Sequence, residues 1–301
     1  MNQPNLLDRC RPKVRLVPTA AWLLALTACA TPQLPTPAPS DPIQIAAQTR
    51  STPDGPQRWT LARLDLTRLR LAITPGTGAS PHEFQPQTTT AALAAAPLTR
   101  LAINASFYAI PTNAPDASQV PAHSRGLDAV GLVIASGQTY SQPETSSRIV
   151  AAVLCITPIR VTIEAAPACA DPAVRDAVAA GPVLLRDGVA PSPALQSEFA
   201  TRRHPRSAIA LSADARTGWL VVVDGRQAGS IGATLPELTA VLAELGADDA
   251  LNLDGGGSTA LALRTGDGAA RLLNTPIDRG IPGQERAVAT HILVIPAPPA
   301  G

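Results

Sequence analysis

The sequence predicts an α+β fold: a single domain of mixed, mostly antiparallel β-sheet with a few flanking helices. Segments with strand character outnumber segments with helical character. Tight turns join neighbouring strands, as at residues 214–218, where a hairpin is expected. Only residues 219–253 have the strand–helix–strand order that is typical of a parallel crossover.

The expected strands are short apolar or alternating segments bounded by polar turn residues. Residues 59–73 alternate in part, with arginines between the leucines, which indicates strands with one solvent-facing side. The Asp187-Gly188 pair predicts a hairpin turn. The remaining strands are predicted at 101–103, 130–135, 182–185, 208–211, 219–224, 250–253 and 288–295.

Three helices are predicted from capping residues and apolar spacing. A short helix is expected at 88–96. A second is expected at 171–180, with Asp171 as its N-cap. The third begins with a capping box at 234–237 and runs to Leu245, with its leucines on one face.

The N-terminal residues indicate export. Basic residues precede an apolar segment at 20–25 that is too short to span a bilayer. The Leu26-Thr27-Ala28-Cys29 sequence is similar to a bacterial lipobox, which implies a signal peptide over 1–28 and lipid on Cys29. Ala30 is typical of lipoproteins anchored in the outer membrane, here facing the periplasm of the cell envelope. An ordinary secretory signal cut near Ala30 is the alternative.

Five prolines between Thr31 and Pro42 predict an extended, disordered tether. Regular structure is expected from near residue 43. We assign 29–55 to the lipidated cysteine and its Pro-rich tether, and 56–297 to the folded domain. The roughly 255 residues that follow the tether suffice for one large domain.

The charge balance excludes one class of partner. Removing residues 1–28 takes four basic and one acidic residue from totals of 24 and 23, which leaves a formal charge of −2. A nucleic-acid-binding protein needs a basic surface, so no nucleic-acid partner is expected. The expected partners are a carbohydrate phosphodiester, for the reasons given below, and the membrane through the N-terminal lipid.

Two cysteines remain for the folded domain, because Cys10 is lost with the signal and Cys29 is assigned to lipid. In an oxidising compartment, Cys155 and Cys169 predict a disulfide that closes a short loop. Such a loop contributes roughly 3 kcal/mol in the chain-entropy model. Free thiols or a nucleophilic cysteine are the alternatives, and no nearby histidine supports a nucleophile.

The run Ala250-Leu251-Asn252-Leu253-Asp254-Gly255-Gly256-Gly257-Ser258-Thr259 is the strongest candidate site. An apolar strand ends in a carboxylate, and three glycines then let the backbone approach a ligand closely. Successive N–H groups in such a turn can form an anion-binding nest. The alternative is a tight glycine turn whose aspartate caps the next segment.

Other polar residues also follow expected strands, where binding sites are commonly built. Asn104 precedes an aromatic pair, Phe107 and Tyr108, that could form a sugar-stacking wall; an asparagine turn with core aromatics is the alternative. Three arginines surround His204 at 202–206, which suits a phosphate or, equally, a solvated loop. His204 is either an acid–base group or turn scaffolding before Pro205.

Asp224 supplies a second carboxylate, and glycosidic cleavage commonly uses two. No motif for zinc, a P-loop or a nucleophilic serine is present. No cofactor is therefore expected, and metal ligation by Asp254 or Asp224 stays open without a spacing signature.

The order of these segments resembles the phosphodiester glycosidase family over roughly residues 60–296. Its strongest parts are the D-G-G-G-S-T run, the G-P-x-L segment at 181–184 and the P-R-x-A-I segment at 205–209. The resemblance implies hydrolysis of a sugar-1-phosphodiester, with N-acetylglucosamine as one candidate sugar, in envelope or exopolysaccharide glycans. One departure is Asn104-Ala105-Ser106, where the family usually has Asn-Gly-Gly. The family's polar signature falls on Asn104, Arg206, Asp224, Asp254, Gly255, Gly256, Gly257, Ser258 and Arg286.

The resemblance suggests a division of roles. Arg206, with Arg286 and the N–H groups of the glycine turn, is expected to hold the phosphodiester. Asp254 is expected to act as base or nucleophile at the anomeric carbon, with Asp224 as its partner. Asn104 is expected to hydrogen-bond the sugar. His204 and Thr259 complete the expected substrate-binding residues.

Two other functions fit the same residues. One is a catalytically inactive, lipid-anchored protein that binds envelope glycans. The low aromatic content of the chain, 3%, counts against it because carbohydrate-binding modules usually offer aromatic platforms. The other is a phosphodiesterase that cuts the P–O bond and releases a sugar phosphate.

Overall fold

The computed structural model describes residues 41–76, 84–110, 126–145, 149–191 and 195–298. The expected signal peptide, Cys10, Cys29 and the prolines before residue 41 lie outside the described residues. Residues from Asp41 onward form one compact unit. Within the described ranges, no helix is both long enough and apolar enough to cross a membrane.

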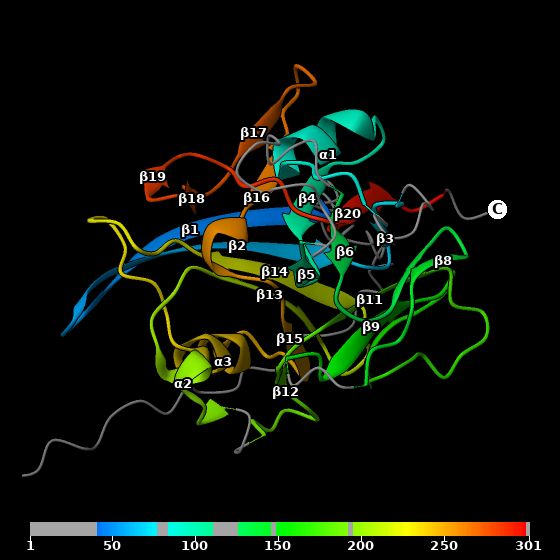
Figure 1. Ribbon diagram of the computed structural model, residues 1–301, viewed down its shortest axis with the longest axis horizontal. Coiled ribbons are helices and arrows are strands. Elements are labelled where there is room, and N and C mark those ends of the chain that lie inside the picture. Colours follow the sequence, from blue (N-terminus) through cyan, green and yellow to red (C-terminus); the bar gives the residue numbers. More distant parts are fainter. Residues whose placement is uncertain (1–40, 77–83, 111–125, 146–148, 192–194, 299–301) are drawn as a thin grey trace, which may run out of the picture. The chain divides into compact units, whose positions relative to one another are not determined.

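A six-stranded sheet, antiparallel throughout, forms the centre of this unit (Figure 1). The predicted crossover at 219–253 is present, and β13 lies between its two strands, β14 and β15. In sheet order, the strands are β1 (Ile43–Thr52), β2 (Gly55–Asp65), β14 (Thr217–Val223), β13 (Arg206–Leu211), β15 (Asp249–Asn252) and β12 (Val183–Leu185).

Strand β1 corrects the assignment of 29–55 to a tether. It pairs with β2 along its whole length, from Ile43 opposite Leu64 to Thr52 opposite Gly55. Most of its side chains are exposed, because it is an edge strand of the sheet. Its stability therefore comes from backbone pairing, which leaves little apolar pattern in the sequence. In the described residues, regular structure begins at Ile43, near the change in composition, and not at residue 56.

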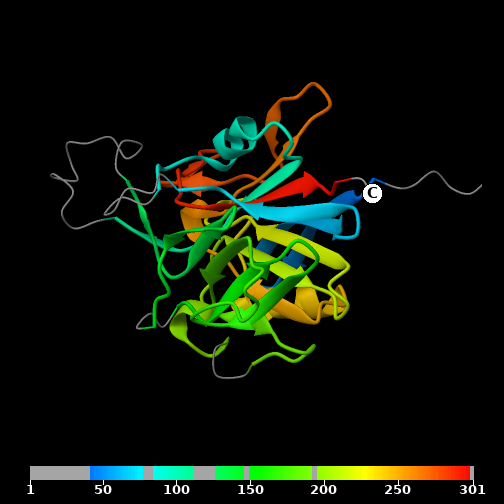
Figure 2. The same cartoon turned by 90° about the vertical axis from the view of Figure 1, so that its right-hand side faces the viewer.

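Two five-stranded sheets complete the fold. The first has the order β10 (Val161–Ala165), β9 (Ala152–Ile156), β11 (Asp176–Ala180), β7 (Val133–Ala135) and β8 (Gln138–Ser141). The second has the order β17 (Ala270–Leu272), β16 (Leu261–Arg264), β4 (Leu101–Asn104), β20 (His291–Pro296) and β3 (Leu69–Ile73). Figure 2 shows β3 and β20 side by side in this second sheet. Two short hairpins are formed by β5 (Tyr108–Ala109) with β6 (Asp128–Ala129), and by β18 (Ile277–Asp278) with β19 (Ile281–Pro282).

The predicted α+β class is confirmed, and the helices within the described residues are α1 (Thr89–Ala95), α2 (Glu198–Thr201) and α3 (Leu235–Glu244). The helices expected at 88–96 and from 234 are α1 and α3, and the capping box of α3 is formed. α3 packs on one face of the six-stranded sheet, and the other two sheets share a core with its opposite face (Figure 1). Leu220 and Val222 face that shared core, whereas Val221 and Val223 face α3. Burial on both faces explains the continuous apolar run of β14.

The prediction of a helix at 171–180 is wrong. Asp171 caps only a turn, in which its Oδ1 accepts a hydrogen bond from the Ala173 N–H at 2.8 Å. Residues Asp176–Ala180 form β11, and all five are buried between β9 and β7. The alanine-rich segment has helical propensity, but it lies in the middle of a sheet, where small side chains fit on both faces.

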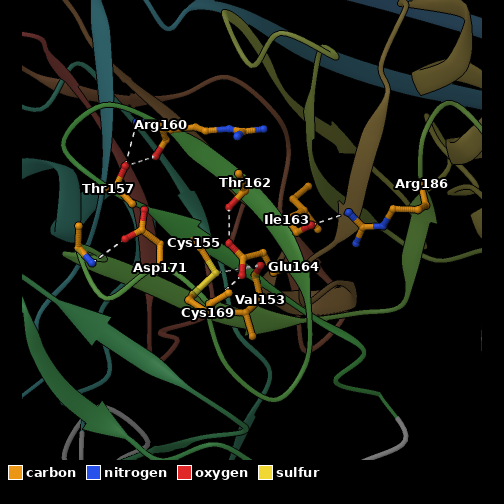
Figure 3. Close-up of a disulfide and its surroundings, with 12 residues drawn as sticks. Val153, Cys155, Thr157, Arg160, Thr162, Ile163, Glu164, Cys169, Asp171 and Arg186 are labelled. Atoms are coloured by element: carbon orange, nitrogen blue, oxygen red, sulfur yellow. Dashed lines mark hydrogen bonds between the residues drawn. A yellow bond between two sulfur atoms is a disulfide. The ribbon is translucent and has the colours of Figure 1, made fainter.

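The predicted disulfide between Cys155 and Cys169 is formed (Figure 3). It joins β9 to the loop that follows β10. Glu164 closes the same loop, because its carboxylate accepts hydrogen bonds from the Thr162 hydroxyl at 2.8 Å and the Ala170 N–H at 2.7 Å. The short segment is thus held by both covalent and polar contacts.

Candidate active site

The glycine run forms a loop between the end of β15 and a 3-10 turn at Gly256–Ser258. Backbone hydrogen bonds fix its first residues, from the Leu253 N–H to the Ser207 carbonyl and from the Asp254 N–H to the Ala105 carbonyl, each at 2.9 Å. The carboxylate of Asp254 is therefore presented from a backbone that two different sheets hold in place.

Asn104 lies beneath this loop and not in a ligand site. Its side chain is completely buried. Its Nδ2 donates to the Asp254 carbonyl at 2.6 Å, and its Oδ1 accepts from the Ser207 hydroxyl and the Ala260 N–H, at 2.8 and 3.2 Å. The predicted contact between Asn104 and the sugar is therefore wrong. Asn104 is a positioning residue that ties β4, β13 and the glycine loop together.

Glycine is required in the loop at positions that a side chain could not occupy. Gly256 has a φ of +62°. A Cβ on Gly257 would lie 2.6 Å from Cζ of Arg286, so the guanidinium rests directly against this residue. The expected nest of N–H groups is not formed by the first two glycines. The Gly255 N–H donates to the Asp254 carboxylate at 2.8 Å, and the Gly256 N–H donates to the Pro205 carbonyl at 2.9 Å.

Asp254 opens onto a cavity of about 280 Å³ that we call the arginine cavity. It brings together a carboxylate, an imidazole and three guanidinium groups from segments far apart in the chain. Its lining residues are Phe199, His204, Arg206, Arg226, Asp254, Gly255, Gly256, Gly257 and Arg286.

The surroundings of Asp254 in this cavity change the pKa of its carboxyl group. Burial raises its pKa from 3.8 to about 6, and the Ser258 hydroxyl, the Gly255 N–H and the Arg286 charge oppose that rise. A carboxylate with a pKa near 6 is ionised at neutral pH yet readily protonated, which suits a catalytic base or nucleophile.

Arg206 is less available for a ligand than the sequence predicts. Its Nε donates to the Ala233 carbonyl at 3.1 Å, and its Nη2 donates to the carbonyls of Phe199 and Arg202 at 2.7 and 2.8 Å. The guanidinium also lies 4.8 Å from the centroid of the Phe199 ring. Burial lowers the pKa of Arg206 to about 10. Arg206 thus contributes charge to the cavity wall while it holds α2 in place.

Arg226 also lines the arginine cavity. Its Nη2 lies 3.1 Å from Nδ1 of His204, and its guanidinium lies over Gly256. Because arginine only donates, His204 accepts at Nδ1 and carries its proton on Nε2. Burial and the neighbouring arginines lower the pKa of His204, so the imidazole is neutral. Arg226 has a φ of +58°, a left-handed conformation that is uncommon outside glycine and is often found at functional sites.

Asp224 does not line the arginine cavity, so its predicted role as the partner carboxylate of Asp254 is not supported. Its Oδ1 accepts hydrogen bonds from Asn274 Nδ2 at 3.0 Å and from the Thr275 N–H at 2.9 Å. Its Oδ2 is buried, 4.0 Å from Nη1 of Arg58. Burial raises its pKa. Asn274 in turn donates to the Thr259 carbonyl at 3.3 Å, so Asp224 supports the glycine loop from behind.

Ser258 and Thr259 are each 1% exposed and lie behind the cavity wall. Neither residue lines the arginine cavity, so their predicted contact with substrate is not supported, although the Ser258 hydroxyl acts on the Asp254 carboxylate. Both residues lie where the loop leads into β16, and both are buried there.

Arg286, which is expected to hold the phosphodiester, lines the arginine cavity. Its Nε donates to Asp278 Oδ1 at 2.7 Å, and this partner raises its pKa against the effect of burial. Arg286 also lines a second cavity of about 280 Å³, which we call the tyrosine cavity. The residues that line the tyrosine cavity are Tyr108, Ile110, Leu127, Asp278, Arg279, Arg286 and Ala287.

Comparison with protein families gives one match. The family model for phosphodiester glycosidases matches residues 99–295, about two thirds of the chain. The chain belongs to the phosphodiester glycosidase family. No curated protein matches it significantly in sequence.

Several solved structures have a similar fold. The catalytic domain of zebrafish N-acetylglucosamine-1-phosphodiester alpha-N-acetylglucosaminidase, auto-inhibited by its pro-peptide, superposes with a TM-score of 0.62 at 17% identity, over 86% of this chain and 85% of that one. A putative exported protein of Burkholderia pseudomallei has a TM-score of 0.55 at 17% identity, over 80% and 74%. A hypothetical protein from Synechocystis has a TM-score of 0.52 at 18% identity, over 84% and 62%. At such identities these likenesses establish the fold alone.

Several residues that line these cavities were not singled out from the sequence, among them Arg226, Phe199 and Asp278. Arg226 directly follows Asp224-Gly225 at the end of β14, a position that could have marked it. Phe199 and Asp278 belong to no motif, and only the folded chain brings them to the cavities. Among the described residues, no group of three or more histidine, cysteine, aspartate or glutamate side chains is placed to hold a metal ion.

Proposed function

We propose that this protein hydrolyses a sugar-1-phosphodiester by breaking the bond between the anomeric carbon and the phosphate oxygen. The observation that carries the proposal is the arginine cavity, in which the Asp254 carboxylate faces the guanidinium groups of Arg226 and Arg286. The negative charge of Asp254 suits the anomeric carbon, where positive charge develops. The positive charges of Arg226 and Arg286 suit the phosphate that leaves.

The phosphate is held by the two guanidinium groups that retain donors toward the cavity. Arg286 approaches across Gly257, and Arg226 approaches across Gly256. Neutral His204 adds an Nε2–H donor. A phosphate monoester leaves readily, so charge stabilisation by arginine can replace strong general-acid help.

Asp254 acts at the anomeric carbon, either by attack or by removing a proton from the attacking water. It supplies the carboxylate among the residues that line the arginine cavity. Water provides the new hydroxyl on the sugar, and the electron pair of the broken bond leaves with the phosphate monoester. The proton released from water first resides on Asp254 when it acts as the base.

The test is product analysis by mass spectrometry in ¹⁸O-labelled water. The purified chain is incubated with UDP-N-acetylglucosamine and with a simple N-acetylglucosamine-1-phosphodiester, and Asp254→Asn serves as the inactive control. Label on the free sugar, absent with the variant, supports the proposal. Label on a phosphate overturns it in favour of P–O cleavage. Glycan binding without turnover, unchanged in Asp254→Asn, overturns it in favour of a binding protein.

The substrate is drawn from envelope or exopolysaccharide glycans, with N-acetylglucosamine as the first sugar to test. The name of the zebrafish relative supports this choice. The protein is proposed to act at the cell envelope, anchored by lipid on Cys29 and facing the periplasm from the outer membrane. The disulfide supports an oxidising compartment. Intact mass measurement of the protein and of Cys29→Ser, purified from membranes, tests lipid attachment through the loss of the acyl mass in the variant.

A further inference from the structure

The arginine and tyrosine cavities meet at one side chain. Arg286 lines both of them, and its position is fixed on two sides. Asp278 accepts a hydrogen bond from its Nε at 2.7 Å, and Gly257 leaves the space against which the guanidinium rests. A ligand that spans the two cavities therefore passes directly over Arg286.

The two cavities differ in chemistry. The arginine cavity is lined by three guanidinium groups and by glycine backbone, which suits an anion. The tyrosine cavity combines the half-buried Tyr108 with Ile110 and Leu127. Its charged groups, Asp278, Arg279 and Arg286, are paired with one another, because Asp278 contacts Arg286 at 2.7 Å and Arg279 at 3.8 Å. An aromatic and aliphatic wall beside polar groups whose charges are already paired suits a pyranose ring, which has an apolar face and a rim of hydroxyls.

The size of the tyrosine cavity limits what can bind. Its volume of about 280 Å³ lies just below the roughly 300–1,000 Å³ range of small-molecule sites. One sugar ring is therefore a better match than an extended glycan.

Asp254 belongs to the cavity that also contains Arg286, the side chain shared with the tyrosine cavity. It lines the arginine cavity, and its charge also acts on the Tyr108 hydroxyl, as does Arg286. The bond between a sugar and its phosphate would therefore lie beside Asp254 when each part occupies the cavity that matches its chemistry.

We propose that the tyrosine cavity is the subsite for the sugar ring of the substrate, with Tyr108 and Ile110 as its specificity-determining wall and Arg286 at the boundary with the phosphate. This assignment rests on the proposed function for the direction of the substrate. It makes Tyr108 and Ile110 sugar-contacting residues and leaves Arg226 with the phosphate.

The experiment measures the binding of the two halves of the substrate separately, by titration calorimetry on the full chain. The probes are free N-acetylglucosamine and inorganic phosphate. Ile110→Trp fills the mouth of the tyrosine cavity, and the 53% exposure of Ile110 makes this change compatible with folding. Leu98→Trp is the matched control, because Leu98 is 79% exposed and lines neither cavity. Arg226→Ala probes the arginine cavity.

We expect Ile110→Trp to weaken sugar binding by about tenfold and to leave phosphate binding within about twofold. Arg226→Ala should weaken phosphate binding by about tenfold or more and leave sugar binding unchanged. Tyr108→Phe, which keeps the ring, should bind the sugar more tightly than Tyr108→Leu. Leu98→Trp should change neither affinity.

The opposite pattern overturns the subsite: sugar binding that is lost in Arg226→Ala and retained in Ile110→Trp would place the ring in the arginine cavity. Absence of sugar binding to the unaltered protein, with a KM that Ile110→Trp does not change, also overturns it. If diesters are hydrolysed and Ile110→Trp changes neither KM nor sugar binding, the proposed function remains and the subsite is refuted. Separate binding of the two probes, without hydrolysis of any sugar-1-phosphodiester, keeps the subsite and removes the proposed function.

Discussion

Replacing Asp254 by asparagine should make the protein more stable at neutral pH while it abolishes turnover. A rise of the pKa from 3.8 to about 6 means that ionising Asp254 costs about 3 kcal/mol more in the folded protein than in the unfolded chain. Between those two pH values the folded state binds more protons than the unfolded state, so stability falls as the pH rises. Asparagine removes this cost and keeps an oxygen that can accept from the Gly255 N–H.

The expected gain is therefore near zero at pH 3.5 and between about 1 and 3 kcal/mol at pH 8, which is a rise in Tm of several degrees for a domain of this size. Urea unfolding of both proteins at the two pH values measures it. Glu244→Gln is the control, because Glu244 forms an exposed ion pair with Arg50 that is worth little. An Asp254→Asn protein that is equally destabilised at both pH values would refute the reasoning, because the carboxylate would then not be buried at a cost.

Three further outcomes are expected. The acid limb of the kcat/KM profile should have an apparent pKa near 6, since only ionised Asp254 can act, and a limb near pH 4 would contradict the burial of that carboxylate. Gly257→Ala should reduce kcat/KM by about tenfold or more, because its methyl group displaces the Arg286 guanidinium, whereas Gly266→Ala, whose methyl group meets no atom within 4 Å, should behave like the unaltered enzyme. Asn104→Ala should lower the free energy of unfolding by about 2–4 kcal/mol in urea titrations, since it leaves buried partners unpaired, and a loss below about 0.5 kcal/mol would contradict the role assigned here.

The sequence predicts the fold class well, because its turns and caps are local. The capping box of α3 and the Asp187-Gly188 turn depend on a few adjacent residues, and both are formed. The predictions fail where burial on both faces decides the conformation. Residues Asp176–Ala180 have helical propensity, and only their place inside a sheet makes them a strand.

The candidate site is predictable in part for a related reason. A glycine run next to an aspartate is a local signal, and Asp254 and Arg286 both line the cavity that the structure presents. Which polar residues face a ligand depends on the three-dimensional surroundings. Asn104 and Asp224 have the right chemistry for a site, but their hydrogen-bonding groups are directed to the protein itself. The two arginines show the same contrast. Arg206 donates to backbone carbonyls, whereas Arg226 contacts the cavity residue His204.

The hydrogen bonds of Asn104 have a consequence for how the chain acquires activity. This residue is 150 positions from Asp254 and 103 positions from Ser207, so its contacts close only when distant parts of the chain have met. Ordering such long loops is entropically costly and slows folding compared with a chain of local contacts. The glycine loop is therefore held in place by contacts with distant parts of the chain. Recovery of activity on refolding should therefore follow the assembly of the whole domain, and no shorter fragment of the chain is expected to carry a preformed site.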